Sequence, residues 1–204
     1  MKQTKTIALI SISGFILFLV IVCSLHFLRP DKNMLSCYIS EYAVGNYSWL
    51  LKISYYVLAT STALMLTGLL LNIDASKTSI ITLGIFSFGI LLASIFPTDV
   101  PVLPPTSIGL IHGIAALIAL ISLGITMIAW GFVFKKKENW KSFVKPSTYF
   151  GVLSLVLFII HFASPLPIRG LTQRFLLVWD ISWLLLVSNK LYRNSLLPEP
   201  QLIG

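Results

Sequence analysis

The chain has 204 residues, of which 56% are hydrophobic and only 11% are charged. Soluble domains carry about 25% charged residues, so this composition excludes an ordinary water-soluble globule and predicts an integral membrane protein. The formal net charge is +8, and the lysines lie between apolar runs. Basic residues in such places set membrane topology and contact anionic lipid headgroups, so we do not expect nucleic-acid binding.

Six apolar runs are long enough to cross a bilayer as helices. A membrane-spanning helix needs about 20 apolar residues to cross about 30 Å of hydrocarbon. The runs are continuous rather than alternating, which disfavours the strands of a barrel. We therefore predict an all-α bundle that forms a single transmembrane domain over residues 1–204. The predicted spans are about 7–28, 49–72, 78–96, 107–134, 146–165 and 171–192.

The first run, 7–28, follows Lys2 and Lys5, as the apolar part of a signal peptide would. However, it is as long as a full membrane span, and no small-x-small cleavage site follows it. We therefore expect this segment to be retained as the first helix of the bundle.

The segment after this helix reads LRPDKNMLSCYISEYAVG (28–45) and is unusually polar for this chain. Within 34–43 the apolar side chains share one helical face, with Ser36 and Ser40 opposite and Glu41 near the boundary. This pattern predicts a short amphipathic helix at the membrane interface. Its polar side either roofs a cavity between helices or serves only as an anchor.

Basic residues gather on one side of the predicted membrane. With six spans, the residues before the first span, after the second, after the fourth and after the sixth all share that side. Basic residues favour the cytoplasmic side, so we expect both termini in the cytoplasm. The residues are Lys2, Lys5, Lys77, Lys135, Lys136, Lys137, Lys141, Lys145, Lys190 and Arg193.

Polar residues gather on the opposite, outer side, where they form a candidate ligand-binding site. They lie in the first outer loop, in the FPTDVP segment, and near the outer ends of the last three spans. The candidates are Arg29, Ser36, Ser40, Glu41, Asp99, His112, His161, Arg169, Gln173, Arg174 and Asp180.

The last span carries a polar stripe. At about 100° per residue, Arg169, Gln173 and Asp180 fall within about 60° of one another. Asp180 then lies roughly 16 Å below the outer surface, where a carboxylate costs about 2.5–3.5 kcal/mol. It needs a partner or a proton, and it is either a site residue or part of a structural pair. Its candidate partners are His112, His161 and Arg174.

The outer residues include possible catalytic groups, but the chain has no catalytic motif. His112, Asp99 and Glu41 are candidates for acid–base chemistry. A catalytic triad is defined by its geometry, and no GxSxG or HExxH sequence is present. The spacing of Cys23 and Cys37 fits no zinc site. We predict two unpaired thiols, no metal and no cofactor, and leave enzymatic activity open.

Four blocks carry a family resemblance: LRPDKNMLSCYISEYAVGNYSWL, IFPTDVP, IHGIAAL and GLTQRFL, in this order. Over about residues 10–192 the chain resembles the bacterial membrane family called domain of unknown function 998. The resemblance implies a compact six-helix bundle in the bacterial cytoplasmic (inner) membrane, with an outward-facing polar site but no known activity. His161 and Asp180 lie outside its blocks. The residues that it carries over are Arg29, Ser36, Ser40, Glu41, Asp99, His112, Gln173 and Arg174.

Four functions follow from these observations. We favour a protein that handles a membrane lipid or another small amphiphile, with Arg29, Arg169 and Arg174 available to meet a phosphate or carboxylate. The alternatives are a membrane-embedded hydrolase or transferase, a small proton-coupled transporter that uses Asp180, and a non-catalytic membrane subunit. The oligomeric state is left open.

Overall fold

The structure is a computed structural model that describes residues 2–99 and 104–197, so part of the predicted domain 1–204 lies outside the described residues. Within these ranges there are six long helices, three short 3-10 helices and no strand. All six long helices could cross a membrane by length and composition, which confirms the predicted all-α bundle. The helices are α1 (Lys2–Leu28), α2 (Ser48–Leu70), α3 (Lys77–Ile95), α4 (Ser107–Phe134), α5 (Val144–Ala163) and α6 (Arg169–Asn194), with η1 (Ile39–Ala43), η2 (Glu138–Phe143) and η3 (Leu166–Ile168) between them.

One predicted boundary differs clearly from the structure. Helix α1 begins at Lys2 rather than at residue 7, whereas the other boundaries lie within about two residues of the prediction. Hydropathy indicates where a chain enters the hydrocarbon, but a helix can continue into polar residues because its backbone hydrogen bonds remain satisfied.

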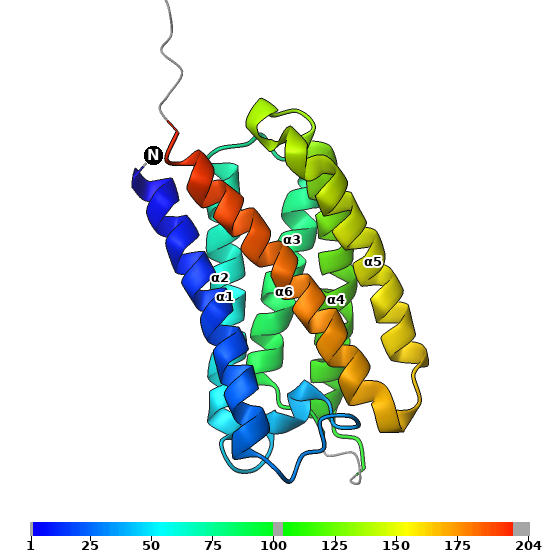
Figure 1. Cartoon of the computed structure of the whole chain (residues 1–204). Helices are drawn as coiled ribbons and strands as arrows, with labels where there is room; N and C mark the ends of the chain where they lie inside the picture. The colour runs from blue at the N-terminus through cyan, green and yellow to red at the C-terminus, as the bar shows by residue number, and fades with distance from the viewer. Residues whose placement is uncertain (1, 100–103, 198–204) are drawn as a thin grey trace, which may run out of the picture.

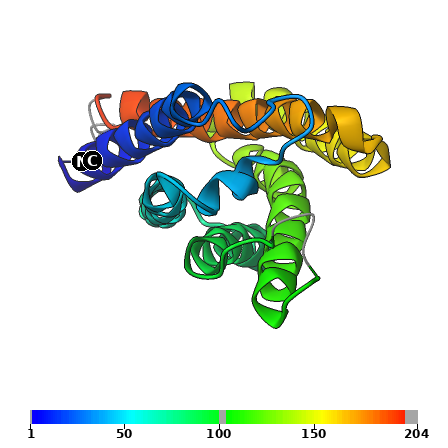
Figure 2. The ribbon, with the colours of Figure 1, turned by 90° about the horizontal axis from the view of Figure 1, so that it is seen from below.

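The six helices are arranged in two layers (Figures 1 and 2). Helices α1, α6 and α5 form one layer, and α2, α3 and α4 form the other. Consecutive helices pack against each other, and α6 also packs against α1. The last helix therefore lies between α1 and α5, where its polar side chains can reach both the first loop and α5.

The two ends of the bundle differ in character. Figure 1 shows the start of α1, the end of α6 and η2 at one end, which we call the basic end. Residues 29–47, 96–99, 104–106 and 164–168 lie at the other, which we call the polar end. The termini of the bundle thus share one end. The assignment of that end to the cytoplasm rests on its lysines and stays a prediction.

Two buried tryptophans show how polar atoms are accommodated in the core of the bundle. The indole of Trp183 donates to Ser147 Oγ at 2.7 Å, and that of Trp130 donates to the carbonyl of Ser79 at 3.1 Å. An N–H group without a partner is costly in an apolar interior. These bonds therefore connect α5 to α6 and α3 to α4.

The first loop folds differently from the predicted amphipathic helix over 34–43. Its helical part is only η1, all of whose residues are buried. The backbone N–H of Ile39 donates to Gln173 Oε1 at 2.7 Å, and that of Leu171 donates to the carbonyl of Leu35 at 2.9 Å. Because these bonds to α6 draw the segment into the bundle, it does not form an independent helix at the interface.

Candidate functional site

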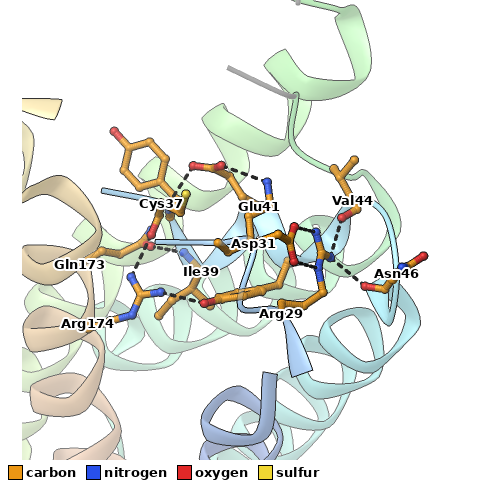
Figure 3. Close-up of polar contacts among 12 residues, drawn as sticks. Arg29, Asp31, Cys37, Ile39, Glu41, Val44, Asn46, Gln173 and Arg174 are labelled. Atoms are coloured by element: carbon orange, nitrogen blue, oxygen red, sulfur yellow. Dashed lines mark hydrogen bonds and ion pairs between the residues drawn. The ribbon is translucent and has the colours of Figure 1, made fainter. Parts of the chain in front are cut away.

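Arg29 fixes the shape of the first loop (Figure 3). Its Nε and Nη2 atoms each donate to the carboxylate of Asp31 at 2.8 Å. Its Nη1 donates to the carbonyls of Val44 at 2.9 Å and Asn46 at 2.7 Å. The hydrogen-bonded ion pair raises the pKa of the Arg29 guanidinium and lowers that of the Asp31 carboxyl. Arg29 is therefore committed to the loop rather than available to a ligand.

Arg174 fastens α6 to α1 and to the first loop. Its Nη1 donates to the carbonyls of Cys37 and Gly170, both at 2.8 Å. Its Nε donates to Nε2 of His26 at 2.7 Å, and its Nη2 lies 3.3 Å from the hydroxyl of Tyr42. A guanidinium carries five N–H donors, and three of the four contacts named here, those to His26, Cys37 and Tyr42, join α6 to residues more than 130 positions earlier in the sequence.

Glu41 and Ser36 also belong to the loop rather than to a cavity. The carboxylate of Glu41 accepts from the backbone N–H of Tyr38 at 2.9 Å and lies 3.5 Å from Lys32 Nζ. Glu41 thereby holds the start of η1. Ser36 is half-buried in the turn before it. Cys37 and the exposed Cys23 are both free thiols.

Asp99 joins the loop after α3 to the start of α4. Its carboxylate accepts from the hydroxyl of Thr106 at 2.7 Å and from the backbone N–H of Thr106 at 3.0 Å. Thr106 in turn caps α4, since its Oγ1 accepts from Gly109 N at 3.0 Å. The hydrogen bonds from Thr106 lower the pKa of the Asp99 carboxyl. Both carboxylate oxygens therefore already have partners.

Two adjoining cavities lie at the polar end. We call the larger one, of about 450 Å³, the lateral cavity, and it lies between α4 and α5 beside the loops. The smaller one, of about 70 Å³, lies beneath η1, and we call it the inner chamber. The residues that line both are Ser40, His112, Ala116, Leu120 and Gln173.

Two buried histidines line the lateral cavity. His112 Nδ1 lies 2.8 Å from the carbonyl of Phe96. A carbonyl only accepts, so Nδ1 carries a proton and Nε2 is the acceptor of the neutral ring. His161 Nδ1 lies 3.1 Å from Thr172 Oγ1, and its ring packs edge-on against Tyr38. The hydrogen bonds at Nδ1 therefore fix the orientation of both rings.

Gln173 is oriented by η1. Because its Oε1 accepts from Ile39 N at 2.7 Å, its NH₂ group must face away from that bond, and the side chain lines both cavities. Ser40 also lines both cavities, and Tyr55 lines the inner chamber. Sequence reasoning missed Tyr55, for which the only signal was a hydroxyl within an apolar span.

A comparison with known families identifies the chain at the family level. The model of a family described as Protein of unknown function (DUF998) matches residues 12–189. The chain belongs to this family. No curated protein and no solved structure matches it. The resemblance drawn from the four sequence blocks is thus confirmed.

Arg169 and Asp180 lie outside both cavities of this DUF998 protein. Arg169 Nε donates to the carbonyl of Ser164 at 2.7 Å, and its Nη1 lies 3.2 Å from the hydroxyl of Tyr38. Asp180 is buried, and its Oδ1 accepts from Ser154 Oγ at 2.6 Å. The structure thus pairs Asp180 with a serine of α5 rather than with a histidine or an arginine.

The predicted site residues therefore separate into two groups. Those in the cavity walls are Ser40, Asp99, His112, His161 and Gln173. Those outside the walls of both cavities are Arg29, Ser36, Glu41, Arg169, Arg174 and Asp180. Across residues 2–99 and 104–197, no group of three or more His, Cys, Asp or Glu side chains is placed to hold a metal ion.

A further hollow differs from these cavities in its chemistry. It is a groove of about 370 Å³ between α5 and α6, lined mainly by apolar side chains such as Leu153, Phe175 and Val178. Such a surface suits lipid chains, but it lacks the convergent polar groups that orient a specific ligand. The lateral cavity and the inner chamber are therefore the candidate site.

Proposed function

We propose that this DUF998 protein binds an amphiphile whose apolar chain lies in the lateral cavity and whose polar head points towards the inner chamber. One observation carries the proposal: the same cavity joins buried polar side chains to apolar side chains on the outside of the bundle. Among its lining residues, His112 is 4% exposed, whereas Leu110 and Phe162 are 62% and 61% exposed.

The mouth of the lateral cavity would face lipid in a membrane. Leu110 and Ile114 on α4 and Phe162 on α5 line it and are exposed on the outside of the bundle. A large exposed apolar side chain on a membrane-spanning helix meets hydrocarbon rather than water. An amphiphile could therefore enter sideways from the bilayer without first passing through water.

The size and chemistry of the cavity suit such a ligand. Its volume of about 450 Å³ lies within the range of about 300–1,000 Å³ for small-molecule sites. Its wall is mostly apolar, and three of its polar residues, Ser40, His112 and Gln173, also border the inner chamber. If the basic end faces the cytoplasm, the ligand comes from the outer leaflet.

Two glycines provide a matched test. Gly113 lines the lateral cavity, and a Cβ atom there would meet nothing within 4 Å. The same is true of a Cβ at Gly84 on α3, which does not line the cavity. Gly113→Leu should fill the cavity, whereas Gly84→Leu should leave it open.

The measurement is lipid retained by the purified protein after extensive detergent washing, quantified by native mass spectrometry. We expect about one amphiphile per chain in the wild type and in Gly84→Leu, and its loss in Gly113→Leu. Equal retention by all three proteins, or no retention by any, would contradict the proposal.

Acid–base catalysis on the bound amphiphile is a second candidate function. It is favoured by His112, whose Nε2 is an acceptor and whose ring lines both cavities together with Ser40. In this role His112 would accept a proton from a water molecule or from the Ser40 hydroxyl. The test is product formation from an ester amphiphile, which His112→Gln should abolish while the ligand still binds.

A further inference from the structure

We infer that the head of the bound amphiphile is uncharged and carries hydroxyl groups, as in a monoacylglycerol, rather than a phosphate, a carboxylate or an amine. This inference rests on the proposed function and narrows its ligand class. It follows from the lack of lysine and arginine among the described residues of the cavity walls, from the hydrogen bonds that already engage their one carboxylate, and from the kinds of hydrogen-bonding groups that meet at the inner chamber.

No lysine or arginine among the described residues lines either cavity. Five lysines and arginines lie at the polar end. Four of them form hydrogen bonds or ion pairs outside the cavities, with Asp31, Glu41, Ser164 and the carbonyls of the first loop and α6. Residues 100–103 are Val, Pro, Val and Leu, so that part of the sequence brings no charge. The basic residues are Arg29, Lys32, Lys52, Arg169 and Arg174.

An anionic head would therefore enter the site without a lysine or arginine to meet it. Removing an ionised group from water is costly unless it is paired. A phosphate or carboxylate head is thus disfavoured, contrary to the sequence-based expectation that Arg29, Arg169 and Arg174 would bind one.

A cationic head meets a similar obstacle. Asp99 is the one carboxylate among the described lining residues, and both of its oxygens accept hydrogen bonds from Thr106. It borders the lateral cavity but not the inner chamber. Glu41 and Asp180 line neither cavity. An amine in the inner chamber would thus have no carboxylate beside it.

Uncharged polar groups, by contrast, surround the inner chamber. They are the hydroxyls of Ser40 and Tyr55, the NH₂ group of Gln173 and Nε2 of His112. Ser40 and His112 are buried, and Tyr55 and Gln173 are half-buried. Polar groups at such depth usually have a hydrogen-bond partner, so a chamber lined by all four is suited to a bound polar group.

A hydroxyl group matches this mixture of hydrogen-bond donors and acceptors. It donates one hydrogen bond and accepts up to two, so it can donate to His112 Nε2 and accept from the Gln173 amide. The chamber, of about 70 Å³, is small beside the lateral cavity of about 450 Å³. It therefore takes only the tip of the head, one or two hydroxyl groups, while the rest of the head stays in the lateral cavity.

The test compares four ligands with the same oleoyl or oleyl chain: monoacylglycerol, oleic acid, oleylamine and lysophosphatidic acid. Each competes with a fluorescent monoacylglycerol for the full chain in detergent. We expect the monoacylglycerol to bind at least about tenfold more tightly than the three charged ligands, about 1.4 kcal/mol.

A double variant tests the inner chamber itself. Ser40→Ala/Tyr55→Phe removes two hydroxyls, and Ser36→Ala/Tyr56→Phe is its control because neither residue lines the cavities. The first variant should lose about tenfold in monoacylglycerol affinity, and the control should lose none.

The outcomes separate this inference from the proposed function. If a charged ligand binds most tightly, or if the two double variants behave alike, the inference is wrong but amphiphile binding stands. If none of the four ligands binds, the proposed function fails as well.

Discussion

Gln173 on α6 and Ile39 in η1 are joined by a hydrogen bond of 2.7 Å, although 134 residues separate them in the sequence. The bond satisfies a buried backbone N–H and at the same time turns the Gln173 amide towards the cavities. One side chain thus couples the fold of the first loop to the geometry of the candidate site.

Gln173→Ala should therefore destabilise the protein. The buried N–H of Ile39 would lose its acceptor, which costs about 1–3 kcal/mol. The measurement is thermal unfolding in detergent, with Gln3→Ala as the control because Gln3 is exposed on α1. Equal melting temperatures for the two variants would show that the bond does not hold the loop.

Gly45→Ala should also weaken the loop. Gly45 has φ = +85°, a left-handed conformation that costs other residues about 1–2 kcal/mol, and a Cβ atom would lie 3.3 Å from Nη2 of Arg29. Gly84→Ala is the matched control because its Cβ meets open space. An alanine in that helix should stabilise the protein by up to about 1 kcal/mol, so the two variants should shift the melting temperature in opposite directions.

Asp99 should contribute to stability above about pH 4. Its pKa is lowered in the folded state by hydrogen bonds from Thr106, so its contribution is fully present above the unfolded-state value and is lost as the pH falls through the lower folded-state value. Asp99→Asn should reduce the fall in melting temperature between about pH 5 and pH 3.

The control for this pH series is Glu138→Gln, which removes an exposed carboxylate at the basic end. If wild type, Asp99→Asn and Glu138→Gln lose stability in parallel as the pH falls, the ionisation of Asp99 does not contribute to the pH dependence of stability.

Asp180 and Ser154 should behave as a buried structural pair. Ser154→Ala removes the donor to Oδ1 and leaves both oxygens of a buried carboxyl without a partner, at a cost of about 1–3 kcal/mol. Replacing both partners by apolar residues can be nearly neutral, so Ser154→Ala/Asp180→Leu should recover much of the loss in melting temperature. If the double variant is instead less stable than Ser154→Ala, the pairing is not the role of Asp180.

The fold could be predicted from sequence because each span is encoded locally. About 20 consecutive apolar residues have few stable alternatives to a membrane helix, so the six helices of the bundle were found. The family blocks and the polar end could likewise be read directly from the sequence.

Which polar residues hold the loops in place and which line the cavities could not be predicted in this way. Arg29 and Arg174 looked like ligand-binding residues, but they donate to backbone carbonyls such as those of Val44 and Cys37, which appear in no side-chain pattern. The helical period of 34–43 was likewise overridden by bonds to α6. The roles of Arg29 and Arg174 and the conformation of 34–43 depend on contacts between residues that are far apart in the sequence.

The central claim, that an amphiphile lies in the lateral cavity, is tested most directly by photo-crosslinking. A monoacylglycerol with a diazirine in the middle of its chain is bound, irradiated and mapped by mass spectrometry of peptides. We expect labels near Leu117 and Leu120 of α4 and Phe158 of α5, which line the lateral cavity, and their loss in Gly113→Leu. Labels confined to the apolar groove between α5 and α6, at residues such as Leu153 and Val178, would contradict the claim.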